Sequence, residues 1–134
     1  MTIERPDPLN HVMPGPPLAI AAGVLFLVNL MLLPGLGFVA LLVLWLRHRD
    51  HADPLVRNHL QQNVVASLWG GAVLVGFSLA IIGLGGFANP WTWVIGVLYF
   101  VLVHAGLIYL GVMGMIRAMN GHAWRFPLIG PPLP

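Results

Sequence analysis

Residues 64–84 read VVASLWGGAVLVGFSLAIIGL, and this stretch decides the fold class of the chain. It contains no Asp, Glu, Lys or Arg, and the uncharged run around it extends from residue 58 to residue 116. A second run without these residues extends from residue 8 to residue 46. A soluble helix of such length would present a polar face, whereas a helix in lipid is apolar all round. The pattern therefore predicts a polytopic membrane protein.

The composition agrees with this prediction. The 134 residues are 58% hydrophobic and 7% charged, which lies outside the range of soluble globular proteins. All six basic residues are arginine and the formal net charge is only +2, so we expect no nucleic-acid partner. The chain has no cysteine, which excludes disulfides and thiolate chemistry. We expect a single domain.

Proline-rich segments lie at both ends of the chain. Residues 1–17 (MTIERPDPLNHVMPGPP) contain five prolines and predict an extended N-terminal arm. Residues 122–134 (HAWRFPLIGPPLP) predict an extended C-terminal arm in the same way. The transmembrane helical domain is then expected over residues 18–121. Because the N-terminal arm lacks a basic region, we expect no cleaved signal peptide and a first apolar segment that stays in the membrane.

The first apolar segment, residues 18–46, is interrupted by Pro34-Gly35-Leu36-Gly37, which must kink or break a helix. Two arrangements are compatible with it. One tilted, broken helix could cross the bilayer, or residues 18–33 could cross it and residues 38–46 dip back. The latter segment would reach only about 14 Å, well short of a hydrocarbon core of about 30 Å. The whole segment is therefore expected to supply one crossing.

Two further helices have clear boundaries. Asp53-Pro54 is an N-cap followed by proline at the first helical position, and the apolar run continues to Leu84. Asn89-Pro90 repeats this start, and Asn120-Gly121 is a C-terminal stop for a helix over residues 91–119. The fold class predicted is an all-α membrane protein with three transmembrane helices, the first broken at residues 34–37.

Arginine placement predicts the orientation. Arg47, Arg49 and Arg57 precede the second helix, and Arg117 and Arg125 end or follow the third, so both regions are expected on the cytoplasmic side. With three crossings the N-terminus would lie outside and the C-terminus in the cytoplasm. Interfacial tryptophans agree with this orientation, namely Trp91 and Trp93 outside and Trp45 and Trp124 inside. We expect the inner membrane of a bacterium.

Two motifs resemble a known family. Residues 44–65, LWLRHRDHADPLVRNHLQQNVV, resemble the Tic20-like (DUF4870) membrane proteins through residues 47–50, Pro54, His59 and Gln62. Residues 116–128, IRAMNGHAWRFPL, are similar to the closing motif of that family. The residues that carry this second match are Ile116, Ala118, Asn120, Gly121, Phe126, Pro127 and Leu128. The resemblance covers roughly residues 18–128.

The resemblance implies a fold more than a function. Its relatives include plastid inner-envelope import components, magnetosome-membrane proteins and many bacterial proteins of unknown role. None of them has an established active site, so no catalytic residue is carried over to this chain.

His104 is unusual because an ionisable group inside a membrane helix is costly and often functional. Counted from the expected outer ends of the helices, Asn29, Ser78 and His104 fall within about 5 Å along the membrane normal, which predicts a polar layer. His104 could be a neutral partner in interhelical hydrogen bonds, or an axial ligand for haem or a chlorophyll-type pigment. His59 would lie about 16 Å away along the normal, so a second ligand would have to come from another chain.

A belt of polar residues is expected at the cytoplasmic interface. Its members are Arg47, Arg49, Arg57, His59, Gln62, Arg117 and Arg125. With His48, His51 and His122 nearby, this belt could bind a metal or sense pH, but its spacing matches no metal signature, and we expect attraction to anionic lipids. The amides of residues 61–63 would either line a polar vestibule or cap the interface.

Ala72, Gly76 and Ala80 recur every four residues and form a stripe that permits close helix packing. The stripe could pack within the chain or form a groove for another subunit.

No nucleophile and base pair, phosphate loop or paired carboxylates appear, so we expect neither an enzyme nor a soluble small-molecule substrate. The leading hypothesis is a non-catalytic accessory subunit of a larger inner-membrane complex, which contacts other membrane protein subunits through the small-residue stripe and both arms. One alternative is a Tic20-like component of protein translocation or membrane biogenesis, which would contact its substrates near residues 61–63. A third is a pigment-binding or haem-binding subunit that uses His104.

Overall fold

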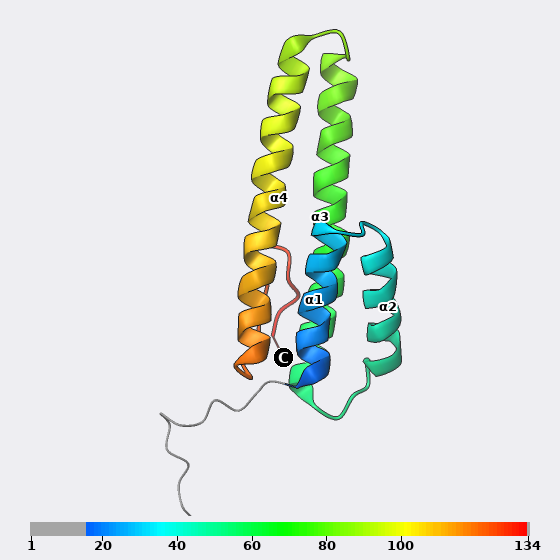
Figure 1. The fold of residues 1–134 in the computed structure, drawn as a ribbon, viewed down its shortest axis with the longest axis vertical. Helices are drawn as coiled ribbons and strands as arrows, with labels where there is room; N and C mark the ends of the chain where they lie inside the picture. Colours follow the sequence, from blue (N-terminus) through cyan, green and yellow to red (C-terminus); the bar gives the residue numbers. More distant parts are fainter. Residues whose placement is uncertain (1–15, 134) are drawn as a thin grey trace, which may run out of the picture.

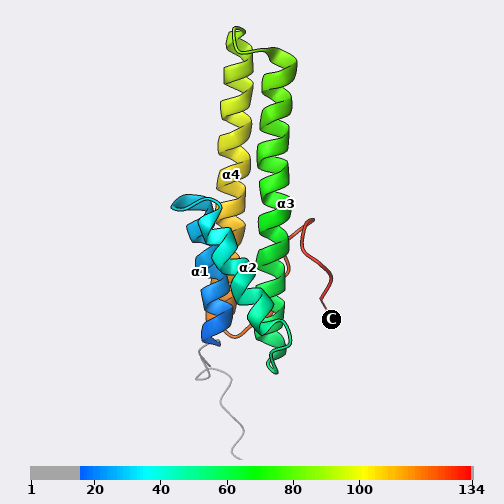
Figure 2. The ribbon, with the colours of Figure 1, turned by 90° about the vertical axis from the view of Figure 1, so that its right-hand side faces the viewer.

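The computed structural model describes residues 16–133, and this range contains four α-helices and no strand (Figure 1). The helices are α1 (Pro17–Met31), α2 (Leu36–His48), α3 (Pro54–Gly85) and α4 (Pro90–Met119). The α3 and α4 helices form a long antiparallel hairpin. The α1 and α2 helices form a short hairpin that lies against only one half of it (Figures 1 and 2). Most of the predicted N-terminal arm lies outside the described residues.

Two of the four helices are long and apolar enough to cross a membrane. These are α3, with 32 residues, and α4, with 30. The α1 and α2 helices have 15 and 13 residues, so they extend only about 20 Å each, against a hydrocarbon core of about 30 Å. The all-helical prediction is confirmed, but the structure has two helices of spanning length instead of three.

The predicted break at residues 34–37 is confirmed, and it reverses the chain. Gly35 has a φ of 87°, which favours glycine. The side-chain oxygen of Asn29 accepts hydrogen bonds from the backbone N–H groups of Gly35 (2.9 Å) and Phe38 (3.1 Å), so it caps α2. A Cβ on Gly37 would lie 2.6 Å from the backbone nitrogen of Asn29, so only glycine allows α2 to fold back so closely.

This reversal changes the predicted topology. The α1 helix begins at the end of the bundle where α3 begins and α4 ends (Figure 1). We call this the arginine end, because Arg47, Arg49, Arg57 and Arg117 lie there, and we call the opposite end, at residues 86–89, the turn end. The two termini were expected on opposite sides of the membrane, but the described start of the chain lies at the same end as Met119. The reason is that α1 and α2 together return to the side from which they start.

The predicted helix boundaries are confirmed. The Asp53 carboxylate accepts a hydrogen bond from the N–H of Leu55 (2.8 Å), and the Asn89 side chain accepts one from Trp91 (3.0 Å). The α4 helix ends at Met119, with Gly121 in the left-handed region at a φ of 70°.

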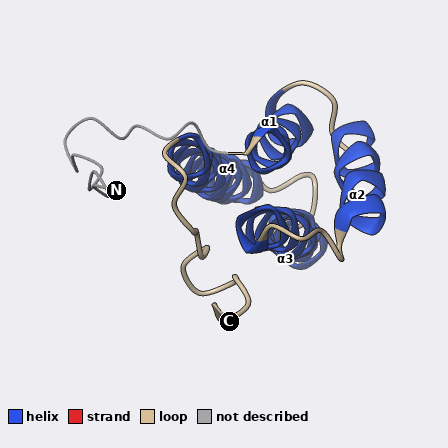
Figure 3. Ribbon diagram, turned by 90° about the horizontal axis from the view of Figure 1, so that it is seen from below, coloured by secondary structure: helices blue, strands red, loops and turns tan. Residues whose placement is uncertain are grey.

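The buried core lies in the arginine-end half of the bundle. Its members come from α1, α2, α3 and the C-terminal arm and are Ala22, Phe26, Leu41, Val56, Leu60, Val64, Ala66 and Phe126. The arm, residues 122–133, runs back from α4 and lies beside α3 (Figure 3). Among residues 16–133, α3 and α4 contact only each other in the turn-end half, and large apolar side chains such as Leu84 and Trp91 are exposed (Figures 1 and 2).

Candidate functional site

Three side chains in the first turns of α3 hold the C-terminal arm. We call Asn58, His59 and Gln62 the clasp. The Gln62 side chain bonds the arm twice, because its oxygen accepts from the N–H of Phe126 (3.1 Å) and its NH₂ donates to the carbonyl of Pro131 (2.8 Å). Gln62 is only 1% exposed, so these bonds satisfy an amide that burial would otherwise penalise.

Asn58 and His59 complete the clasp. The Asn58 oxygen accepts from the N–H of Trp124 (2.9 Å), and Nε2 of His59 donates to the carbonyl of His122 (2.8 Å). The side chain of Asn63, one residue beyond the clasp, donates to the carbonyl of His59 and is also buried. The clasp therefore fixes the arm at four residues along its length, which are His122, Trp124, Phe126 and Pro131.

Aromatic packing beneath the clasp explains how the arm is buried. Phe126 is fully buried, with its ring centroid 5.2 Å from that of Phe26 and 5.7 Å from that of Trp124. Glycines on α4 make room for these rings. A Cβ on Gly111 would lie 2.6 Å from Phe26, and one on Gly114 would lie 2.8 Å from Trp124. The arm is thus an integral part of the helical core.

His59 lies outside the membrane-spanning part of α3. The α3 helix is about 48 Å long, which exceeds a hydrocarbon core of about 30 Å. Residues 54–63, which carry most of its polar side chains, form the excess length. Burial lowers the pKa of His59 below its ordinary value of 6.5 and outweighs the hydrogen bond to His122, which acts in the opposite direction. Nδ1 of His59 is buried and has no partner among the described residues, so a proton there would place a charge in the core.

The structure separates the predicted interface residues into two groups. Arg47, Arg49, Arg57, Arg117 and Arg125 are exposed. His59 and Gln62, which were expected in the same belt, are buried in the clasp, and of the three amides at residues 61–63 only Gln61 is exposed. Sequence reasoning missed Asn58 and the role of Phe126. The spacing of Asn58 and Gln62 by four residues, on one helix face, was the available signal.

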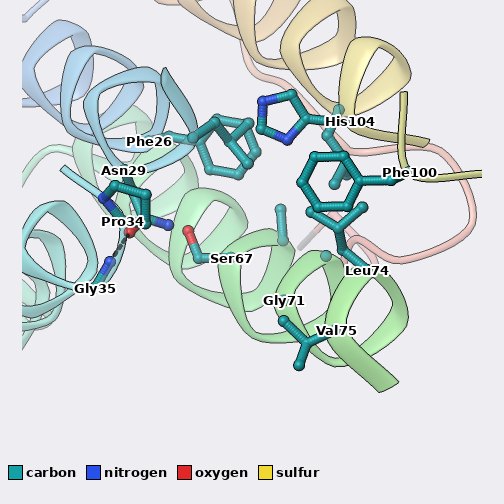
Figure 4. A pocket seen from close by; sticks show the side chains of 14 residues that line it. Phe26, Asn29, Pro34, Gly35, Ser67, Gly71, Leu74, Val75, Phe100 and His104 are labelled. Carbon is teal, nitrogen blue, oxygen red and sulfur yellow. Dashed lines mark hydrogen bonds between the residues drawn. The ribbon is translucent and has the colours of Figure 1, made fainter. Parts of the chain in front are cut away.

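His104 lies in a cavity of about 310 Å³ between α1, α3 and α4 (Figure 4). Its ring stacks on that of Phe100, with centroids 5.3 Å apart and an interplanar angle of 12°. Asn29 and Ser67 line the same cavity. Nδ1 of His104 and the hydroxyl of Ser67 are buried and have no hydrogen-bond partner within residues 16–133.

The predicted polar layer is only partly assembled. Asn29 and His104 share the cavity, but Ser78 lines a different pocket and donates to the carbonyl of Leu74 (2.6 Å) in its own helix. Ser78 lies about two turns from the turn end of α3, whereas His104 lies about four turns from that end of α4. Ser67 occupies the position on α3 that was assigned to Ser78. Haem or pigment binding by His104 stays a prediction.

The small-residue stripe faces outward. Ala72, Gly76 and Ala80 are all exposed, and a Cβ on Gly76 would meet no atom within 4 Å. The stripe therefore does not pack against the described helices of its own chain.

Two long apolar helices, a short hairpin and a clasped arm define a small polytopic helical membrane protein. The sequence model described as the magnetosome magnetite crystal formation protein family (MamF/MmsF) matches residues 18–133. The chain belongs to this family. The family is related to the Tic20-like small membrane proteins, in agreement with the resemblance of the two motifs. Neither the curated proteins nor the solved structures contain a match to this chain.

The two motifs that carry the resemblance meet in space. His59 and Gln62 belong to the first motif and Phe126 belongs to the second, and the clasp joins them. Within residues 16–133, no group of three or more His, Cys, Asp or Glu side chains is placed to hold a metal ion. His59, Gln62 and the arm thus form an internal contact between the two motifs.

Proposed function

We propose that this protein is a non-catalytic structural component of the membrane in which magnetite crystals form, and that it acts by lateral packing with other membrane proteins, including further copies of itself. The family description supplies the process. The outward-facing stripe of Ala72, Gly76 and Ala80 is the observation that carries the proposed packing role.

The proposed lateral packing has its physical basis in the exposed surface of the turn-end half. Helices associate in lipid mainly through close van der Waals packing, because burying apolar side chains provides little driving force there. Small residues four positions apart let a second helix backbone approach closely. In this protein α1 and α2 cover only the arginine-end half, so the stripe on α3 is open to a neighbouring chain (Figure 2).

Charge distribution supports an orientation for this role. The exposed arginines support an orientation with the arginine end on the cytoplasmic side, by the positive-inside rule. The turn end, residues 86–89, then faces the compartment that encloses the crystal. The acids that the structure describes, Asp50 and Asp53, lie at the arginine end, and the proposed role is exerted within the membrane.

The geometry favours packing over the translocation alternative. That alternative, which rests on the Tic20-like resemblance, predicts substrate contacts near residues 61–63, but Gln62 and Asn63 are hydrogen-bonded within the chain. A polar vestibule at this position would require both to leave the core.

The test compares Gly76→Leu with Gly106→Leu. Both glycines are exposed, a Cβ on either would meet no atom within 4 Å, and Gly106 lies on α4 away from the stripe. The full chain would be reconstituted in bilayers, and its self-association and its co-purifying membrane proteins measured by crosslinking and mass spectrometry. We expect association in the wild type and in Gly106→Leu, and its loss in Gly76→Leu. In cells that form magnetite, crystal size measured by electron microscopy should follow the same order.

A wild-type chain that is monomeric and has no defined partner would refute the proposal. Equal association of the two variants would refute the assignment of the packing face to the stripe.

A further inference from the structure

A pocket of about 240 Å³ opens at the arginine end, between the end of α2, the first turns of α3 and the C-terminal arm. We propose that this pocket binds the phosphate-bearing headgroup of one anionic phospholipid from the surrounding membrane. The proposal is independent of the packing role proposed above, and it replaces a diffuse arginine belt with one defined site.

The lining carries the charge that a phosphate requires. Arg49 and Arg57 both line the pocket, and neither Asp50 nor Asp53 does. The Asp53 carboxylate is engaged in capping α3, and Asp50 is 94% exposed in a loose ion pair with Arg49 at 3.7 Å. An arginine guanidinium presents several N–H donors in a planar fork that suits phosphate oxygens.

Further donors converge on the same pocket. Nη1 of Arg57 donates to the carbonyls of His51 and Ala52, which positions the guanidinium and leaves its other N–H groups available. The oxygen of Asn58 accepts from Trp124, so its NH₂ group is left to donate. The exposed amide of Gln61 lines the pocket beside them. The site thus combines two cationic side chains with two neutral donors.

The position of the pocket selects a lipid as the ligand. The first turns of α3 extend beyond the hydrocarbon core, which places the pocket at the level of the headgroups. Trp45, Pro54 and Pro132 form an apolar wall. Tryptophan is enriched at this depth of the membrane. A free phosphate would use only the polar side, whereas a phospholipid would place its phosphate against the arginines and its glycerol and acyl chains along the apolar wall.

The clasp builds one wall of this pocket. Pro132 follows Pro131, whose carbonyl accepts the hydrogen bond from Gln62, and Gln62 itself lines the pocket. The lipid site therefore exists only while the arm is docked, and a bound lipid would in turn favour docking.

The experiment uses the full chain, stripped of lipid in detergent and then titrated with phosphatidylglycerol or phosphatidylcholine, with bound lipid counted by native mass spectrometry. Arg49→Gln/Arg57→Gln is compared with Arg47→Gln/Arg117→Gln, a pair of exposed arginines that do not line this pocket. Both pairs remove two positive charges. We expect one tightly bound phosphatidylglycerol in the wild type and in the control pair, and binding weaker by about tenfold or more in the pocket pair, because charge-assisted hydrogen bonds are lost.

Any one of four outcomes would overturn the proposal. Equal weakening in both pairs would indicate a diffuse belt, and equal affinity for phosphatidylcholine would remove the role of charge. Displacement of the lipid by millimolar inorganic phosphate would make the ligand a free anion. Because Arg57 also holds the preceding loop, Arg49→Gln alone is measured too, with its helicity checked by circular dichroism, and unchanged binding in this folded variant would equally overturn the proposal.

Discussion

The two halves of the bundle are stabilised in different ways. In the arginine-end half, α1, α2 and the C-terminal arm pack against the α3–α4 hairpin and bury a continuous apolar core. In the turn-end half, α3 and α4 stand alone and expose side chains such as Leu84, at 92%, to their surroundings. The first half is therefore specified by contacts within the chain. In the second, the apolar side chains are exposed instead of being covered by other described parts of the chain.

Glycines show the same contrast. Gly111 and Gly114 lie against aromatic rings of α1 and the arm, where a Cβ would clash. Gly76 and Gly106 face open space, where a Cβ would meet nothing. One residue type thus permits internal packing in one region and leaves a smooth outer surface in the other, and only the neighbours of each glycine distinguish these roles.

The largest effect is expected for Phe126→Ala. This side chain is fully buried against Phe26 and Trp124, so its removal leaves a cavity in the core and should cost about 3–5 kcal/mol of stability. Thermal unfolding of the purified chain in detergent measures the loss. The matched variant in the other half is Leu84→Ala, which should change stability by about 0.5 kcal/mol or less because the side chain is exposed. Similar losses in the two variants would mean that the halves do not differ as described.

A smaller effect is expected for Gln62→Leu. This change removes two hydrogen bonds and leaves the N–H of Phe126 buried without a partner, which should cost about 1–3 kcal/mol. Limited proteolysis and amide exchange should show faster opening of residues 122–133 while α3 and α4 stay protected. Its control is Gln61→Leu, at an exposed neighbouring position, which should leave the arm as protected as in the wild type. If both variants release the arm, the clasp is not the contact that holds it.

The mildest perturbation is a change of pH. Because burial lowers the pKa of His59 below 6.5, this residue is neutral above that pH whether the arm is docked or released. Below pH 6.5 the released state takes up a proton that the docked state resists, so docking weakens as the pH falls. Amide-exchange protection factors of residues 122–133 should therefore be lower at pH 5.5 than at pH 7.5. The difference should shrink in His59→Gln, which retains a donor but does not titrate. If the difference between the two pH values is the same in His59→Gln as in the wild type, a group other than His59 causes the pH dependence.

Local signals in the sequence predicted most helix boundaries correctly. The caps at Asp53 and Asn89, the stop at Asn120-Gly121 and the break at residues 34–37 all appear where expected. Each of these signals acts on backbone groups a few residues away, so it can be read without knowledge of the fold. The uncharged runs likewise indicated helices for a membrane, of which α3 and α4 have spanning length.

The number of crossings and the polar layer were predicted less well. A segment that is long enough to cross a membrane once can also fold into a hairpin of two short helices. The close approach of Gly37 to Asn29 allows the hairpin in this chain. The residue count placed Ser78 at the level of His104, but Ser78 lies about two turns from the turn end of α3 and His104 about four turns from that end of α4. Ser67 lines that cavity instead.

The sequence by itself determined the membrane class, the all-helical content and the ends of the helices, because these follow from uncharged length and from capping between near neighbours. Only the tertiary structure decided which polar residues face lipid and which hold the arm. The clasp bonds from His59 and Gln62 join residues 63 to 69 positions apart in the chain, and no local pattern encodes such pairs. They form because the α1–α2 hairpin and Phe126 close a core around α3, and burial then requires every amide in that core to find a partner.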